Sequence, residues 1–151
     1  MNDPMNTDEI KLWKMFLRAH AALMREMDQR LKQKYGVSMT WLDILVQLSL
    51  AEKQRMTHTR LTERVLMTGG GTTRAVDGMV KAGLVVRRAS RKDRRTSYVV
   101  LTEKGAETLK EMTQSQLIAI EELFSSHLIE GDIPVLRALL ARVLGEEKTS
   151  D

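Results

Sequence analysis

The apolar residues change their periodicity between Thr57 and Leu101, and this change limits the fold more than any other feature of the sequence. Thr57 is a helix-capping residue, and the short segment after it has apolar residues at helical spacing: Leu61, Val65 and Leu66. Thr68–Gly71 interrupts that pattern. A second helix is predicted from about Thr72 to Ala82, with Gly83 as a natural C-terminal cap.

Strand-forming residues follow these two helices. Leu84–Val86 and Ser97–Leu101 are rich in β-branched residues and flank a charged loop, which predicts a β-hairpin. Two short helices joined by a tight turn and followed by a hairpin form the winged helix-turn-helix arrangement. In that arrangement the second helix enters the major groove of DNA, and the hairpin reaches the neighbouring backbone or minor groove. We therefore expect a winged helix-turn-helix over about residues 40–101.

Long amphipathic helices are expected on both sides of this segment. The first covers about residues 8–34, follows candidate caps at Asn6 to Asp8 and ends before Tyr35-Gly36. Its apolar stripe is wider than one chain would usually need, so part of it is expected to face a second subunit. The members of the stripe are Ile10, Leu12, Trp13, Phe16, Leu17, Ala19, His20, Leu23, Met24, Met27 and Leu31.

Three more helix starts are predicted from capping residues. Thr40 precedes an apolar helix that runs to Leu50, Thr102 begins a long helix, and Asp132 caps the last helix. In the last helix Leu136, Leu139, Leu140 and Val143 are expected to point inward. The fold class is therefore mainly α with a small β-hairpin wing. We expect one domain over residues 1–151, with helical dimerisation regions at about 8–34 and 102–146.

Positive charge is concentrated in the loop of the hairpin. Residues 87–95 carry a larger excess than the +4 of the whole chain, because one acid, Asp93, stands among six bases: Arg87, Arg88, Arg91, Lys92, Arg94 and Arg95. Most charge runs are only solvated loops. This run, however, lies between two strands directly after a helix-turn-helix pattern, which favours contact with DNA phosphates or the minor groove.

This segment resembles the MarR family of bacterial regulators. The resemblance is carried by Leu61-Thr62-Glu63-Arg64-Val65, Thr68, Thr73-Arg74, Asp77, Lys81-Ala82-Gly83-Leu84-Val85, Arg87-Arg88, Asp93-Arg94-Arg95 and Leu101-Thr102-Glu103-Lys104-Gly105. It implies a homodimer that binds double-stranded DNA, a recognition helix near Thr68 to Lys81, and an inducer site between the DNA-binding and dimerisation parts. It further implies a repressor that a small aromatic or phenolic ligand releases from a pseudo-palindromic operator.

The sequence departs from the family pattern at Gly69-Gly70-Gly71, where relatives often carry polar or larger residues. Glycine offers no side chain to base edges, but it lets backbone N–H groups approach phosphates closely; a simple turn is the alternative. Base contact is assigned above all to Arg74, since arginine to guanine is the commonest specific contact. The predicted DNA-binding residues are Thr68, Gly70, Gly71, Thr72, Thr73, Arg74, Arg91, Arg94 and Arg95. Asp93 is expected to orient Arg95 across the wing.

A ligand cleft is the second candidate site. The residues proposed to line it are Trp13, Phe16, His20, Met24 and Trp41. Large apolar side chains at helical spacing are more often plain core, and a satisfied core histidine is the favoured interpretation of His20.

Several classes of protein do not fit this sequence. The absence of cysteine excludes disulfides, thiolate zinc sites and cysteine nucleophiles. No metal-ligand spacing, nucleophile elbow or cofactor loop is present, so we expect no enzyme, no catalytic residue, no metal and no cofactor. No signal segment or apolar run of membrane length is seen, which predicts a cytoplasmic protein without a membrane partner. The alternative function is a ligand-independent or architectural DNA-binding protein.

Overall fold

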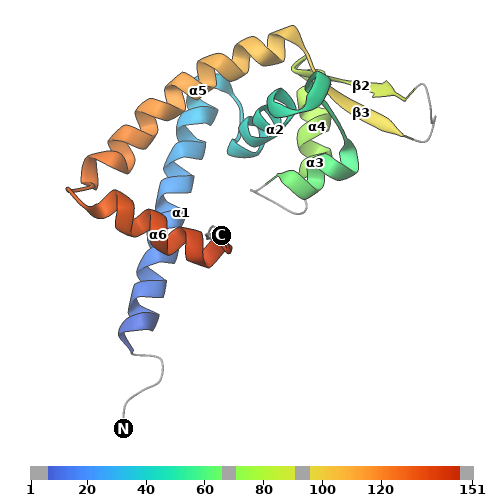
Figure 1. The fold of residues 1–151 in the computed structure, drawn as a ribbon. Helices are drawn as coiled ribbons and strands as arrows, with labels where there is room; N and C mark the ends of the chain where they lie inside the picture. The colour runs from blue at the N-terminus through green and yellow to red at the C-terminus, as the bar shows by residue number, and fades with distance from the viewer. Residues whose placement is uncertain (1–6, 66–70, 91–95, 147–151) are drawn as a thin grey trace. The chain divides into compact units, whose positions relative to one another are not determined.

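A computed structural model describes residues 7–65, 71–90 and 96–146 (Figure 1). The chain divides into two compact units, Met1–Leu117 and Ile118–Asp151, and each is described here by itself. In the described part of the chain, no helix is long and apolar enough to cross a membrane.

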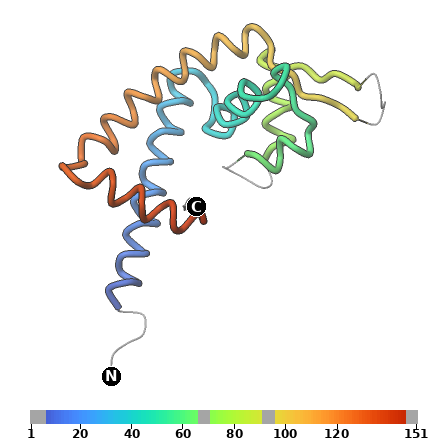
Figure 2. Tube along the Cα trace, viewed as in Figure 1, coloured from blue at the N-terminus to red at the C-terminus, as the bar shows by residue number. Residues whose placement is uncertain are grey.

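The first unit contains five helices and three strands among its described residues. In chain order they are α1 (Asp8–Tyr35), α2 (Met39–Leu50), a short 3-10 turn (Glu52–Gln54), β1 (Arg55–Thr57), α3 (His58–Arg64), α4 (Thr72–Lys81), β2 (Val85–Ala89), β3 (Ser97–Leu101) and the larger part of α5 (Glu103–Leu123). The Cα trace in Figure 2 follows the chain from α4 through the hairpin of β2 and β3 into α5. This order is that of a winged helix-turn-helix, as the sequence predicts.

The core of this unit lies where α2, α3 and α4 pack against the sheet. Its fully buried side chains are Ile44, Leu45 and Leu48 from α2, Leu61 from α3, Val76 and Met79 from α4, and Val85 and Val99 from the strands. Leu31 of α1 and Met112 of α5 join the same cluster. Each large aliphatic side chain buried here contributes about 1.5–3 kcal/mol relative to exposure, so the core fixes α4 and the hairpin relative to each other.

The sheet has three antiparallel strands in the order β1-β3-β2. The hairpin register pairs Val85 with Leu101 and Arg87 with Val99, and β1 adds the pair Met56 and Val99 on the other edge of β3. The hairpin confirms the sequence-based prediction, whereas β1 was missed. The reason is physical: β1 has three residues with one buried apolar side chain, and only its distant partner β3 makes it a strand.

Two of the predicted helix caps are confirmed and two are wrong. Thr57 accepts a hydrogen bond from the N–H of Arg60, and Thr102 accepts one from the N–H of Gly105. Thr40 lies inside α2, because the helix is capped two residues earlier, where the hydroxyl of Ser38 accepts from the N–H of Trp41. Asp132 is the first residue of its helix, after Gly131, and its carboxylate accepts from the N–H of Ile129 outside the helix.

Helix α4 ends where the sequence places its cap. Gly83 has a φ of 75°, a left-handed conformation that favours glycine. Its N–H donates to the carbonyl of Val80, and the N–H of Leu84 donates to the carbonyl of Met79. This is the Schellman pattern, which ends the helix and turns the chain directly into β2.

The start of α5 is locked to the end of α4 by the segment Leu101–Gly105. The backbone N–H of Thr102 donates to the carbonyl of Leu84, and its hydroxyl lies 2.7 Å from the carbonyl of Gly83. Gly105 packs so closely here that a Cβ atom would lie 2.1 Å from the oxygen of Leu84. The spacing of Leu101, Thr102 and Gly105 therefore has a structural cause: the threonine holds the helix start and the glycine lets it approach the strand.

Helix α1 is joined to α2 through Asp28. Its carboxylate accepts from the N–H of Met39 at 2.9 Å and pairs with Lys32. Burial acts to raise the pKa of this carboxyl, but the hydrogen bonds from Lys32 and Met39 and the charge of Lys32 outweigh it, so the pKa of Asp28 is below its ordinary value. Asp28 therefore remains charged and continues to cap the start of α2.

The second unit contains the end of α5, a short 3-10 turn (Ser125–His127) and α6 (Asp132–Leu144). Helix α6 has no buried residue, and Leu139, Leu140 and Val143 are exposed in the single chain. The prediction that they point inward is therefore wrong for one chain taken alone. An apolar groove of about 330 Å³ within this unit is lined by side chains that include Phe124, Leu128, Ile133, Leu136, Leu140 and Leu144.

Candidate nucleic-acid interface

Helix α4 has one buried face and one exposed face. Thr72, Ala75, Val76 and Met79 are buried, at the spacing that places them on one side of a helix. The opposite face exposes Thr73, Arg74, Asp77 and Lys81. The long, positively charged side chain of Arg74 therefore lies on the solvent side of the helix, where a base edge can be reached.

The structure contradicts one predicted contact. Thr72 is 2% exposed, so its side chain cannot reach a base edge as α4 stands. Its hydroxyl is buried and has no hydrogen-bond partner within the part of the chain that the structure describes. The sequence analysis placed Thr72 on the reading face because it starts the helix, but the buried stripe of α4 begins with this residue.

Among the described residues, no side chain caps the first turn of α4. Gly71 is the N-cap residue, and it accepts from the N–H of Ala75 without a side chain to bond the first N–H groups. Uncapped N–H groups at a helix start, together with the helix dipole, favour an anion. Gly71 has a φ of −99°, which any residue adopts. Backbone strain therefore does not explain a glycine at this position.

His58 was not singled out as a DNA-binding residue, although it touches the exposed face of α4. It is the first residue of α3, and its Nε2 lies 3.2 Å from the hydroxyl of Thr73. The contact joins the two helices of the helix-turn-helix beside Arg74. Sequence spacing gave no sign of it, because residues 58 and 73 are brought together only by the packing of α3 on α4.

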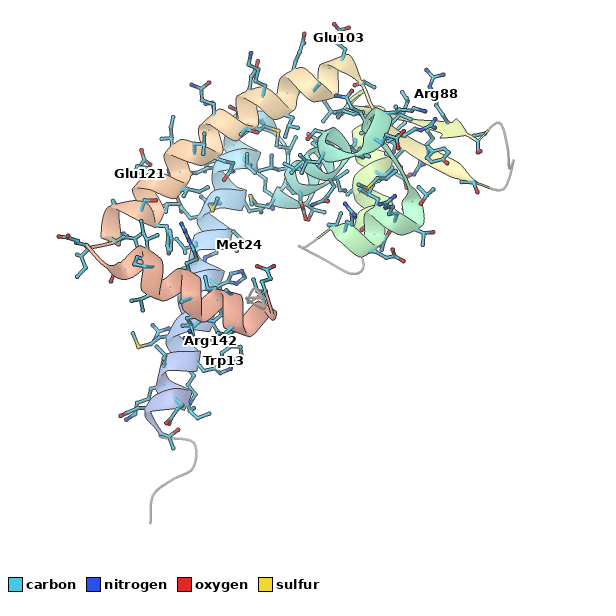
Figure 3. All side chains as sticks on the ribbon, in the orientation of Figure 1. Trp13, Met24, Arg88, Glu103, Glu121 and Arg142 are labelled. Carbon is cyan, nitrogen blue, oxygen red and sulfur yellow. The ribbon has the colours of Figure 1, made fainter. Side chains whose placement is uncertain are left out.

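The wing is tied to α4 by an ion pair. Arg87 on β2 donates to Asp77 on α4 at 2.6 Å. Arg88, the next residue, is exposed on the hairpin, as Figure 3 shows. Because Arg87 neutralises the acid on the exposed face of α4, the charges that remain on this surface are the positive ones of Arg74, Lys81 and Arg88.

Several predicted contacts fall outside the described residues. They are Thr68 and Gly70 before α4, and Arg91, Arg94 and Arg95 in the wing loop, together with the expected pair of Asp93 and Arg95.

The predicted ligand residues do not gather in one chain. Trp13 and Phe16 stack on each other on α1, with ring centroids 5.8 Å apart, and both are exposed. Trp13 and Met24 lie at different levels of α1 (Figure 3). Trp41 instead packs on α4, where its ring would meet a Cβ added to Gly78. His20 is exposed, so it is not the core histidine that the sequence favoured.

A different, mostly apolar cavity, which is shallow and open to solvent, lies beside α5. It has a volume of about 480 Å³ and lies within the first unit, between the end of α2, β3 and α5. Its lining includes Leu101, Ala106, Leu109 and Leu117, with polar groups from Ser49, Gln54, Thr113 and Gln114. Among residues 7–65, 71–90 and 96–146, no three His, Asp or Glu side chains gather as a metal site requires.

Helix α4 is amphipathic and lies beside a three-stranded sheet whose hairpin forms the wing. Basic side chains lie on the exposed side of both the helix and the hairpin. This arrangement defines a winged helix-turn-helix protein. The chain is similar to the MarR family of transcriptional regulators: residues 35–96 match the model described as MarR family, and similarity to transcriptional regulators extends over most of the chain. Members of this family are regulators rather than enzymes, which confirms the prediction that the chain is not an enzyme.

Three known proteins illustrate the similarity. The transcriptional regulator MhqR of Bacillus subtilis is 27% identical over 139 residues, which are 92% of this chain and 93% of that protein. The transcriptional repressor MprA of Escherichia coli K12 is 29% identical over 118 residues, 78% of this chain and 66% of that protein. The structure of Sco3205 from Streptomyces coelicolor, a MarR family regulator in complex with DNA, has a TM-score of 0.83 at 23% identity and covers 99% of this chain and 95% of its own.

Proposed function

We propose that the protein is a repressor that binds a pseudo-palindromic DNA operator as a homodimer and is released by a small ligand. The single observation that carries the DNA-binding part is the exposed face of α4. It presents Arg74 and uncapped N–H groups, and its one acid, Asp77, is neutralised by Arg87 from the wing. Sco3205, which has this fold, has been solved with DNA.

The homodimer is supported by apolar side chains that a single chain leaves uncovered. On α1 these are Leu12, Trp13, Met15, Phe16 and Leu17; on α5 Leu117, Ile118 and Ile120; on α6 Ile133, Val135, Leu139, Leu140, Val143 and Leu144. So many exposed apolar side chains are unusual for a monomer and are typical of an interface. A second copy of the chain has the matching apolar surfaces, and two copies would place two α4 helices on one duplex.

The ligand part of the proposal rests on two places. The cavity beside α5 is apolar with a few polar groups, as small-molecule sites usually are. Trp13, Phe16 and His20 are exposed and Met24 is half-buried, so these four side chains form a ligand site only if a second chain covers them. Trp41 is then not part of that site. Repression is supported by the similarity to MprA. A ligand-independent DNA binder remains the alternative, and a loss of DNA affinity on adding phenolic ligands distinguishes the two.

Replacing Arg74 by alanine tests the base contact. We expect a loss of about 1–3 kcal/mol of binding free energy on the operator and a relaxed preference at one position in each half-site. The cause is the loss of a bidentate arginine–base contact that other bases cannot replace. Fluorescence anisotropy on an operator series with each base pair varied in turn measures both effects.

Arg88→Ala is the matched control, because it removes the same side chain from the wing. It should weaken binding to all sequences about equally and reduce the slope of log affinity against log salt by about one. If Arg74→Ala leaves the base preference unchanged at every position, α4 does not read the bases through Arg74 and this assignment is wrong.

A further inference from the structure

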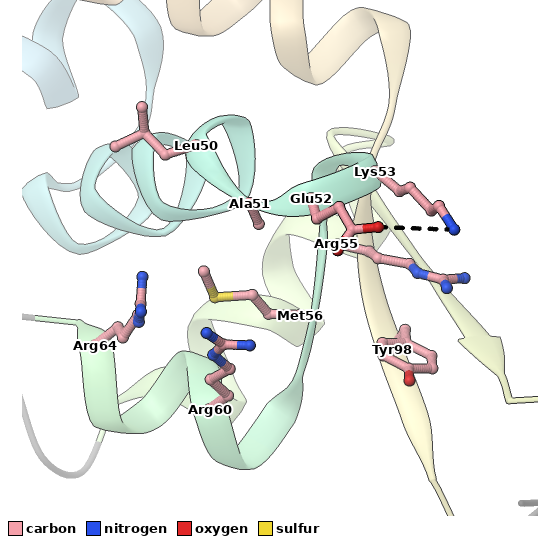
Figure 4. Close-up of a pocket in the computed structure, with 9 residues that line it drawn as sticks. All are labelled: Leu50, Ala51, Glu52, Lys53, Arg55, Met56, Arg60, Arg64 and Tyr98. Atoms are coloured by element: carbon pink, nitrogen blue, oxygen red, sulfur yellow. Dashed lines mark ion pairs between the residues drawn. The ribbon is translucent and has the colours of Figure 1, made fainter.

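A strongly basic pocket lies on the first unit, apart from the face of α4. It has a volume of about 350 Å³ and is shown in Figure 4. The end of α2, the 3-10 turn, β1, α3 and β3 form it, and none of its lining residues belongs to α4 or β2. They are Leu50, Ala51, Glu52, Lys53, Arg55, Met56, Arg60, Arg64 and Tyr98. We call it the arginine pocket.

Three arginines of this pocket have no acidic partner among the described residues. Salt bridges of the described chain do not include Arg55, Arg60 or Arg64. The pocket's one acid, Glu52, pairs instead with Lys53, at 3.8 Å. Figure 4 shows this pair at one side, with Arg60 and Arg64 rising from α3 toward α2.

The placement of Arg60 and Arg64 is unfavourable for the isolated chain. They are four residues apart on α3, a helix of seven residues, so they share a face and repel each other. Like charges at this spacing destabilise a helix. An oxyanion between them would turn the repulsion into attraction.

Arg55 is held at the opposite wall of the pocket. Its guanidinium lies over the ring of Tyr98, 4.5 Å from the centroid, which restrains the side chain while leaving its N–H groups free to donate. Guanidinium groups recognise phosphate through paired N–H donors, and several around one cavity suit a group with many acceptor oxygens. The lining is more polar than apolar, which favours a compact, highly charged ligand over an oily one.

We propose that the arginine pocket is a phosphate-binding site separate from the exposed face of α4. The phosphate belongs either to a free phosphorylated small molecule or to the backbone of the bound duplex. Binding of a free phosphate compound is measured without DNA, so this inference and the proposed DNA-binding function can fail independently.

Sodium pyrophosphate titrated into the full-length protein by isothermal calorimetry, at constant ionic strength, tests the site. We expect one pyrophosphate per chain, and a loss of affinity of at least about fivefold for each of Arg60→Gln and Arg64→Gln, since hydrogen bonds to charged groups are removed. Both side chains are exposed, so the variants should fold, and circular dichroism checks this. Arg18→Gln removes the same charge from the exposed surface of α1, outside the arginine pocket, and should leave pyrophosphate affinity unchanged.

The proposal is overturned if the wild-type protein does not bind pyrophosphate, or if Arg18→Gln weakens binding as much as the pocket variants do. The source of the phosphate follows from operator binding by the same variants. If these variants leave the slope of log operator affinity against log salt unchanged, the pocket binds a free phosphorylated ligand. If the variant that carries both Arg60→Gln and Arg64→Gln has a salt slope for operator binding that is reduced by about two, the pocket binds the DNA backbone, because two phosphate contacts are then lost.

Discussion

A protein carrying Leu12→Asp and Val143→Asp is expected to be monomeric and to bind its operator about 100 to 10,000 times more weakly than the wild type. Both side chains are among the most exposed apolar residues of the chain, 64% on α1 and 73% on α6, so neither change disturbs the core. The loss of affinity follows because two linked half-site contacts become one. Analytical ultracentrifugation gives the mass, and anisotropy gives the affinity.

Leu50→Asp is the matched control for the mass measurement. Leu50 is as exposed as these residues but lies at the end of α2, on the DNA-binding module. We expect this variant to sediment as a dimer. The homodimer proposal is contradicted if the double variant keeps the mass of two chains, or if the wild-type protein is monomeric at micromolar concentration.

Gly105→Ala is expected to lower the free energy of unfolding by about 3 kcal/mol, at the upper end of the usual cost of overpacking. The added Cβ would lie 2.1 Å from the carbonyl oxygen of Leu84, and a backbone oxygen cannot rotate away as a side chain can. Relief would require α5 to move from β2, which breaks the hydrogen bonds from Thr102 to Leu84. In a thermal melt this corresponds to a lower Tm by roughly 6–12 °C.

Gly36→Ala serves as the comparison for this prediction. Gly36 has a φ of 68° but nothing within 4 Å of an added Cβ, so only the backbone conformation is strained. That strain is about 1–2 kcal/mol. If Gly105→Ala is no more destabilising than Gly36→Ala, the close packing of α5 on the Leu84 carbonyl is not the reason that position 105 requires glycine.

The sequence predicts the winged helix-turn-helix well because its signals are local. Thr57, Gly83 and Thr102 each form their predicted cap with a partner a few residues away. What sequence alone misses depends on distant partners. Strand β1 exists because β3 pairs with it, and the contact of His58 with Thr73 exists because α3 packs on α4.

The candidate site was predictable to a smaller degree. The exposed position of Arg74 follows from helical periodicity, but the burial of Thr72 depends on how α4 meets the core. The arginine pocket was not foreseen, because its bases come from β1 and α3 and converge only in the folded chain. Four apolar residues of α6 were predicted to face inward, yet Leu139, Leu140 and Val143 are exposed and only Leu136 is half-buried. Periodicity identifies an apolar face without saying which chain covers it.

The most direct test of the central claim is the affinity of the full-length protein for a duplex selected from random sequence, compared with a shuffled duplex of the same composition, over a series of salt concentrations. The account predicts one dimer per duplex, half-site centres about 34 Å apart, and binding to the selected duplex at least about 1,000-fold tighter than to the shuffled one. It also predicts affinity that falls steeply with salt. Equal affinity for both duplexes, or affinity that does not depend on salt, would contradict the account.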